Sequence, residues 1–253
     1  MDNSQFFVAQ HYRDFFSREP DQAGLQFFTA NIEQCGADAA CREAKRIDTS
    51  TAFLTSVQFG EVGHLVYRFY KVVFGNLPGA PIPVRFRQLL PDIQEIGSGV
   101  VVNQGDWERQ LEGNKEAFAL AFVQRPAFQA AHNGQSAAAF VDSLFANAGV
   151  APANAERQAA ISAFGAGGAG GQAAALRSVA ESGSVTAKTR NEAFVLMAYL
   201  GYLRRDPDES PDTDFSGYES RLSQLNELGG DRGRAEMVKA FITSTEYRQR
   251  FGQ

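Results

Sequence analysis

Apolar residues recur along most of the chain at the three- and four-residue spacing of helices that bury one face. One such face, near the start, is formed by Phe7, Val8, Tyr12, Phe15 and Phe16. Pro20 then ends the helix, because proline disfavours helical geometry in the residue before it. Asp21 is placed to cap a second helix, Gln22 to Gln34, and we expect a third helix from about Ala39 to Phe59.

The last part of the chain repeats the pattern of the first. Three features return 187 positions later: Phe7 as Phe194, Tyr12 as Tyr199, and Arg18-Glu19-Pro20-Asp21 as Arg205-Asp206-Pro207-Asp208. Two fainter copies lie between them. We therefore predict an all-α fold in which helical repeats of about 60 residues pack into one compact domain, 1–253. The four units span approximately 6–62, 63–135, 136–190 and 191–253.

Three segments interrupt the helical pattern. Gly75 to Pro91 is rich in glycine and proline and predicts a long loop with a short helix at Val84 to Leu90. Gly97 to Gly105 is either extended or another loop. The glycine-rich run Gly165 to Gly171 is expected to be a flexible connector between two helices.

Composition narrows the class of protein. Hydrophobic residues make up 44% of the chain and charged residues 21%, which is typical of a globular protein. The net charge is −5 and no stretch concentrates lysine or arginine, so we do not expect a nucleic-acid partner. No stretch approaches the roughly 18 apolar residues that span a bilayer, so we expect no membrane insertion. The start of the chain lacks the features of a secretory leader, which leaves a cytoplasmic protein or a piece of a longer exported chain.

The two cysteines bear on that choice. Cys35 and Cys41 would point in different directions on one continuous helix, so a disulfide requires the helix to end near Gly36. We expect a disulfide that closes this small loop, with two free thiols as the alternative. A disulfide would indicate an oxidising compartment.

Three motifs together resemble a known family. They are Phe-Val-x-x-x-Tyr, Arg-Glu-Pro-Asp-x-x-Gly-Leu and Phe-x-x-Ser-x-x-Phe, and they resemble the bacterial family called domain of unknown function 4214. The resemblance covers most of the chain and is strongest at 6–75 and 191–252, and the stretch 35–42 looks like a subgroup of the family. It implies a helical domain similar to phycobilisome linker domains, placed in large exported proteins beside adhesion, calcium-binding or matrix modules. The family commonly has an aromatic residue, often Trp, shortly after the glycine of the turn. This chain has Phe27-Phe28 in the first copy and Ser220-Arg221 in the last.

Catalytic motifs are missing from the sequence. His11, His64 and His132 have no motif around them, and no nucleophile elbow, zinc-protease motif or P-loop occurs. His11 lies beside the apolar stripe of the first helix, where a structural role is expected. We therefore do not expect an enzyme.

An acidic loop follows Arg205 and gives the one indication of a metal. Asp212, Asp214 and Ser216 match the opening of a calcium-binding loop of the EF-hand type. The twelfth position, normally Glu, is Ser223. The alternative is a solvated loop in which Ser216 or Asp214 caps the next helix. No cofactor is required by the sequence, and Ca²⁺ is the only candidate.

The repeated turn is the remaining candidate site. In the structural interpretation, Arg18 and Arg205 pair with acids or helix-end carbonyls, while Asp21 and Asp208 cap helices. In the functional interpretation, these four side chains form a polar rim that binds sugar hydroxyls. The apolar floor would then be Phe27 or Tyr218.

These observations favour a non-catalytic module of an exported or cell-surface bacterial protein. Its expected partner is an extracellular polysaccharide, another matrix component or a surface protein. The alternative is a structural linker or assembly subunit that acts through protein–protein association, including self-association, without a small ligand.

Overall fold

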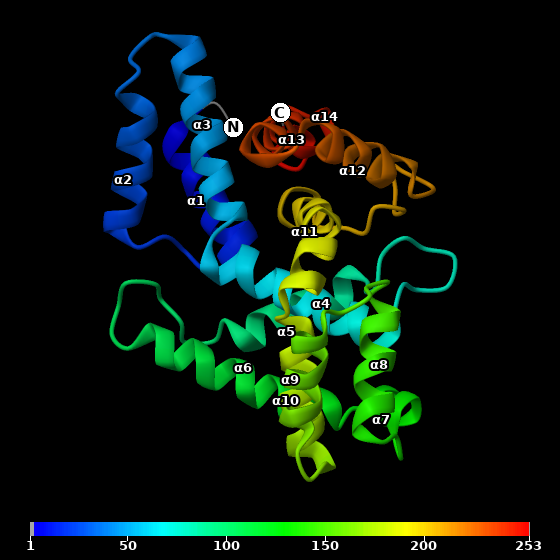
Figure 1. Cartoon of the computed structure of the whole chain (residues 1–253). Coiled ribbons are helices and arrows are strands. Elements are labelled where there is room, and N and C mark those ends of the chain that lie inside the picture. The colour runs from blue at the N-terminus through cyan, green and yellow to red at the C-terminus, as the bar shows by residue number, and fades with distance from the viewer. Residues whose placement is uncertain (1–2, 253) are drawn as a thin grey trace. The chain divides into compact units, whose positions relative to one another are not determined.

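Helices account for all the regular structure in the computed structural model, which describes residues 3–252 (Figure 1). This part of the chain forms fourteen α-helices and two short π-helical segments, with no strand among them. The predicted all-α class is therefore confirmed. Within the same residues, no helix combines the length and the apolar character needed to cross a bilayer.

The helices gather into two compact units, Met1–Glu61 with Phe194–Gln253, and Val62–Ala193, which we call the outer unit and the middle unit. The outer unit contains α1 (Ser4–Phe16), α2 (Gln22–Glu33), α3 (Ala39–Leu54), η1 (Val57–Glu61), η2 (Tyr199–Leu203), α12 (Ser216–Leu228), α13 (Gly230–Ile242) and α14 (Thr245–Gln249). The middle unit contains α4 (Val62–Phe74), α5 (Phe86–Ile96), α6 (Trp107–Val123), α7 (Pro126–His132), α8 (Ala137–Asn147), α9 (Asn154–Phe164) and α10 (Gly168–Ala180). Helix α11 (Gly183–Ala198) begins in the middle unit and leads directly into η2.

The core of the outer unit is built from aromatic rings. The Phe15 ring contacts those of Phe53, Phe59 and Tyr202, with centroid separations of 6.2, 4.9 and 5.2 Å. Gly201 permits this packing, because a Cβ atom there would lie 2.3 Å from Cε1 of Phe15. The first and last parts of the chain are therefore packed together through α1 and η2.

The middle unit has a second aromatic core. Its fully buried rings include Phe69, Phe118, Phe122, Phe128 and Phe140. Phe122 lies 5.6 Å from Phe69 and 6.5 Å from Phe128 between ring centroids. These contacts join α4, α6 and α7 around one apolar centre.

A two-residue break ends each of the helices α3, α6, α10 and α13. The four breaks are Thr55-Ser56, Gln124-Arg125, Glu181-Ser182 and Thr243-Ser244. In the three serine breaks, the hydroxyl donates to the carbonyl three residues earlier at 2.8 Å and accepts the backbone N–H three residues later at 3.1–3.4 Å. Such local hydrogen bonds compete with the helical pattern. The helix expected to run from Ala39 to Phe59 therefore ends at Leu54, and that prediction was wrong.

The structure gives other bounds for one predicted helix and decides one segment whose conformation was left open. The short helix expected at Val84–Leu90 is α5, Phe86–Ile96, which continues through Pro91. The helix extends past the proline because Ile93 and Ile96, which are 4% and 0% exposed, belong to its buried apolar face. The segment Gly97 to Gly105, left open between strand and loop, is a loop.

Candidate ligand-binding site

The first repeated turn lies at the surface of the outer unit. Helix α1 ends at Phe16, and its C-terminal capping residue, Ser17, has a left-handed φ of 53°. Arg18 then stacks over the Tyr12 ring, 5.0 Å from its centroid, and lies 3.6 Å from Asp21. Asp21 caps α2 by accepting the Gly24 N–H at 2.8 Å, as predicted, and this bond lowers the pKa of the carboxyl.

The second repeated turn is buried. Arg205 is only 7% exposed and binds both Glu246, at 2.6 and 2.9 Å, and Asp212, at 2.7 Å. Its guanidinium also donates to the backbone carbonyls of Asp206, Pro207 and Glu209. Although burial opposes the charge, the hydrogen bonds with the two carboxylates raise the pKa of Arg205. Its donors are occupied within the protein, so Arg205 cannot act as a rim for a ligand, as the functional interpretation required.

Asp208 and Tyr218 also differ from the functional interpretation. No helix starts at Asp208, because the chain continues as a loop until α12 begins at Ser216. Tyr218 is 0% exposed and cannot serve as an apolar floor for a ligand. Phe27 lies on α2 and is 67% exposed, with its ring against Phe28 at 5.2 Å.

Two aspartates of the acidic loop, Asp212 and Asp214, form hydrogen bonds within the protein. Asp212 pairs with Arg205, and Asp214 accepts the Ser216 N–H at 2.9 Å at the start of α12. Hydrogen bonds from Ser216 lower the pKa of Asp214. Among the residues whose side chains the structure describes, no three His, Cys, Asp or Glu side chains lie close enough together to hold a metal ion. Calcium binding remains a prediction, which a thermal melt with and without Ca²⁺ tests.

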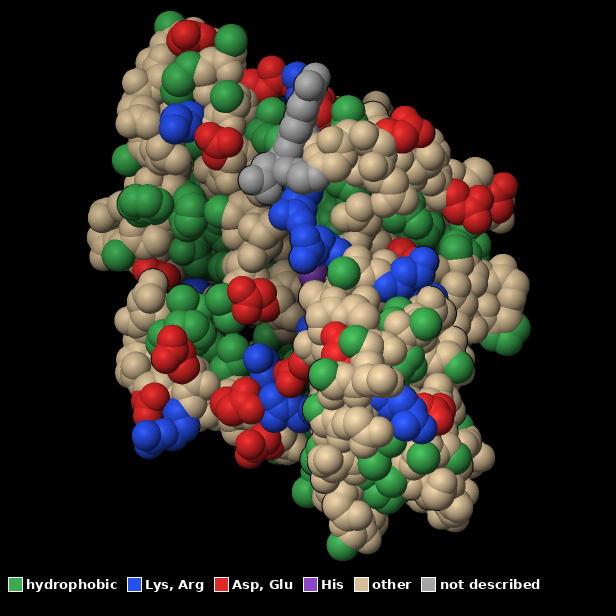
Figure 2. Space-filling view, viewed as in Figure 1, with side chains coloured by type: hydrophobic (Ala, Val, Ile, Leu, Met, Phe, Trp, Pro, Cys, Tyr) green, Lys and Arg blue, Asp and Glu red, His purple; other side chains and the backbone are tan. Residues whose placement is uncertain are grey.

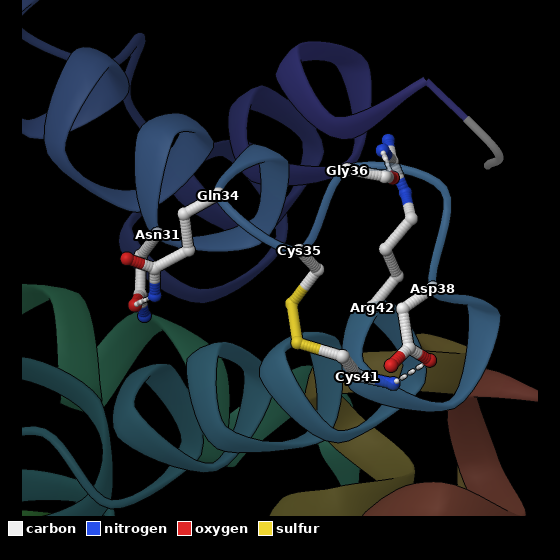
Figure 3. The surroundings of a disulfide bond; sticks show 7 residues. All are labelled: Asn31, Gln34, Cys35, Gly36, Asp38, Cys41 and Arg42. Carbon is white, nitrogen blue, oxygen red and sulfur yellow. Dashed lines mark hydrogen bonds between the residues drawn. A yellow bond between two sulfur atoms is a disulfide. The ribbon is translucent and has the colours of Figure 1, made fainter.

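Cys35 and Cys41 form the expected disulfide, with their Cα atoms 5.6 Å apart (Figure 3). Helix α2 ends at Glu33 and Gly36 takes a left-handed φ of 56°, as the pairing requires. Arg42 donates to the Gly36 carbonyl at 2.9 Å and to Glu33 at 2.6 Å. The disulfide and these bonds fix the end of α2 against α3.

His11 has the structural role that was expected of it. It is 0% exposed, with Nδ1 2.9 Å from the Phe7 carbonyl and Nε2 2.8 Å from the Ser50 hydroxyl. The Ser50 hydroxyl lies in turn 2.7 Å from that of Tyr202. Burial lowers the pKa of His11 to about 4. No ligand can reach this histidine without opening the core.

A pocket of about 480 Å³ in the middle unit has the surroundings of a ligand site. It lies between the end of α7, the turn that follows it, and the connection from α9 to α10. Four side-chain amides line it, from Gln129, Asn133, Gln135 and Gln172, and Phe164 adds a half-buried ring. The other lining residues are glycine and alanine. We call this site the amide pocket.

Two of the four side-chain amides, those of Gln129 and Gln135, each form one contact within the protein. Gln129 donates from Nε2 to the Val123 carbonyl at 2.6 Å, which leaves its side-chain oxygen to accept from a ligand. The amide of Gln135 contacts Nδ1 of His132 at 3.1 Å, and Nε2 of His132 lies 3.1 Å from the Val73 carbonyl. The side chains of Asn133 and Gln172 make no hydrogen bond within residues 3–252. The pocket thus has both fixed and adaptable hydrogen-bonding groups.

The glycine-rich run positions the ring of Phe164 and the start of α10. Gly165 and Gly167 take left-handed φ values of 50° and 82°, which turn the chain within three residues. A Cβ atom at Gly171 would lie 2.1 Å from the Phe164 carbonyl oxygen, so the two helices approach as closely as glycine allows. The expected flexible connector is therefore a tight turn, because α10 begins at Gly168 and takes up the second half of the run.

Sequence reasoning missed the amide pocket. The run Gly165 to Gly171 signalled a close backbone approach, and Gln129 and Asn133 are one helical turn apart. Nothing in the sequence showed that these two segments meet. The amide pocket does not include Arg18, Asp21 or Phe27.

On the face shown in Figure 2, basic and acidic side chains lie in small groups beside one another. No family model, curated protein or solved structure matches the chain. The chemistry of the amide pocket is therefore the main guide to function.

Proposed function

We propose that this protein is a non-catalytic module of an exported or cell-surface bacterial protein, and that it binds an uncharged glycan in the amide pocket. The observation that carries this proposal is a pocket lined by four amides and one aromatic ring, with no charged side chain among its lining residues. Each amide offers two donors and an acceptor, which suits sugar hydroxyls that both donate and accept.

The volume of the pocket and its pre-positioned amides also support an uncharged glycan as the ligand. Its volume of about 480 Å³ lies in the range of small-molecule sites. The Phe164 ring provides an apolar surface of the kind that packs against the C–H face of a sugar. Because Gln129 and Gln135 are already held, less side-chain freedom is lost on binding.

One observation and one expectation support the location. The Cys35–Cys41 disulfide is stable where the environment is oxidising, as outside the bacterial cytoplasm. The resemblance expected from the sequence, to the domain of unknown function 4214 family, would imply the same placement in large exported proteins.

The proposal is tested by measuring binding to a panel of immobilised neutral and acidic polysaccharides. The wild-type protein is compared with Asn133→Ala/Gln172→Ala, which removes the two free amides, and with Gln104→Ala, an exposed amide outside the pocket. We expect binding to at least one neutral polysaccharide, weakened about tenfold or more in the double variant, since each lost hydrogen bond contributes about 1 kcal/mol. Gln104→Ala should bind as the wild type does. Failure to bind any neutral polysaccharide, or equal binding by all three proteins, would contradict the proposal.

Assembly through protein–protein contact is a second candidate function, supported by Phe27. Its side chain is 67% exposed on α2, and aromatic side chains are enriched in protein–protein interfaces. Sedimentation of the wild type and of Phe27→Ser over a range of concentrations tests it. Self-association that Phe27→Ser removes would support assembly, and a strictly monomeric wild type would count against it.

A further inference from the structure

The outer unit has a groove whose lining resembles that of the amide pocket. It measures about 460 Å³ and is lined by the start of α1 and by α2. Its lining residues are Gln5, Gln22, Leu25, Gln26, Thr29 and Ala30. Three amides, one hydroxyl and two apolar side chains line it, and none of the six is charged. We call it the α2 groove.

Helical spacing arranges these groups in two rows. Gln22 and Gln26 are one turn apart on α2, and so are Leu25 and Thr29 on the neighbouring row. A ligand lying along α2 would therefore meet amides on one side and the Leu25 side chain on the other. This combination of hydrogen-bonding groups and an apolar surface is the one found in the amide pocket.

The polar groups of the α2 groove are not used within the protein. No residue whose side chain the structure describes hydrogen-bonds to the side-chain amides of Gln5, Gln22 or Gln26. The Thr29 hydroxyl has no partner in that part of the chain either but is buried, so the three amides are the polar groups that a ligand can reach. A sugar hydroxyl bound here would form hydrogen bonds without first breaking any inside the protein.

The wall of the groove is fixed at both ends. Asp21 caps the start of α2, and the Cys35–Cys41 disulfide ties the chain just after α2 to α3. Glu33 and Arg42 add an ion pair of 2.6 Å at the same end. A helix held in this way presents its row of amides in one position, which lowers the entropic cost of binding.

We infer that the α2 groove is a second site for uncharged glycans, so that one protein molecule binds two glycan segments, one in each compact unit. This inference rests on the proposed function of the amide pocket. Two sites in one monomer also let it link separate polysaccharide chains, and binding two segments of one long chain raises the apparent affinity where both can be reached.

The test is a titration of the ¹⁵N-labelled protein with neutral hexasaccharides of glucose, mannose or galactose, followed by backbone amide signals. We expect two groups of residues to shift, 22–30 and 129–135 with 164–172. Gln22→Ala/Gln26→Ala should abolish the first group and leave the second. Asn133→Ala/Gln172→Ala should do the opposite. Unchanged signals elsewhere in each variant show that it is folded.

The outcomes separate the two proposals. Shifts confined to 129–135 and 164–172 would overturn the second site and leave the proposed function intact. Shifts confined to 22–30 would leave the α2 groove as a glycan site and overturn the amide pocket. No shift with any of the three sugars would contradict both. With long neutral polysaccharide, the wild type should also give turbidity by cross-linking chains, which both double variants should lose.

Discussion

The two Arg-acid-Pro-Asp turns have nearly the same sequence and opposite surroundings. Arg18 stacks on Tyr12 at the surface and approaches one carboxylate at 3.6 Å. Arg205 stacks on Tyr199, 5.5 Å from its centroid, but is buried among two carboxylates and three backbone carbonyls. The motif therefore specifies the arginine–tyrosine contact, whereas burial is decided by the rest of the chain.

What the two turns share is their construction. Each follows a helix that ends on a non-glycine residue with left-handed φ, Ser17 at 53° and Arg204 at 60°. Each also places a tyrosine hydroxyl against a glycine, since a Cβ atom would lie 2.0 Å from Tyr12 Oη at Gly24 and 2.9 Å from Tyr199 Oη at Gly217. These likenesses support the proposal that the two segments are copies of one unit. They also suggest that function lies in segments that the copies do not share, such as those lining the amide pocket.

Replacing each arginine by alanine should separate the two turns most clearly. Arg205→Ala leaves three backbone carbonyls and the partly exposed carboxylates of Glu246 and Asp212 without their donor, and we expect a loss of about 3 kcal/mol in unfolding free energy. Arg18→Ala removes a surface contact and should cost about 1 kcal/mol or less. Urea unfolding of the two variants measures both values. Equal losses would mean that the burial of Arg205 does not distinguish the turns.

A second difference between the two matching segments is at His11, whose counterpart 187 positions later is Ala198. The pKa of His11 is about 4 in the folded protein, below its ordinary value of 6.5. The unfolded chain therefore binds the extra proton between pH 6.5 and 4, so stability is full above pH 6.5 and falls as the pH drops to 4. The expected loss is about 3 kcal/mol.

Urea unfolding between pH 7 and pH 4 checks this expectation. A His11→Gln variant lacks the titrating group and provides the control, because it should lose this part of the pH dependence whatever its own stability. Wild-type and variant curves that fall in parallel over this range would show that His11 is not responsible.

Alanine substitutions at the glycines beside the two tyrosines should give a smaller difference in stability between the two turns. Gly24→Ala forces a methyl group against the Tyr12 hydroxyl and should cost about 1–3 kcal/mol, whereas Gly217→Ala meets a wider gap and should cost less. Tyr12→Phe removes the obstructing oxygen, so Tyr12→Phe/Gly24→Ala should recover part of the loss. Thermal melts of these three variants and of Tyr12→Phe alone measure the four changes in stability. If the double variant loses as much stability as Tyr12→Phe and Gly24→Ala lose together, the contact is refuted.

The sequence predicted features that depend on near neighbours. The cap at Asp21, the disulfide and the structural role of His11 each follow from residues within a few turns of one another, or from one apolar face. The burial of Arg205 depends instead on Glu246, 41 residues away. The end of α3 depends on how Ser56 turns its hydroxyl back to the chain, which helix periodicity does not show.

The amide pocket could not be predicted for the same reason. Its amides and its ring come from segments about 30 residues apart, and glutamine and asparagine at these positions look like any solvated helix surface. The α2 groove was easier to predict, because its two rows of side chains on α2 follow from helical spacing. However, the functional interpretation of the first turn centred on Arg18, Asp21 and Phe27, which line neither site.

The central claim is that glycan binding depends on the amide pocket and not on the repeated turn. Calorimetric titration with the best-binding neutral hexasaccharide tests it most directly, in Asn133→Ala/Gln172→Ala and in Arg18→Ala. We predict that the double variant loses the signal of the amide pocket, while Arg18→Ala retains wild-type affinity. Wild-type affinity in the double variant together with lost binding in Arg18→Ala would contradict the claim.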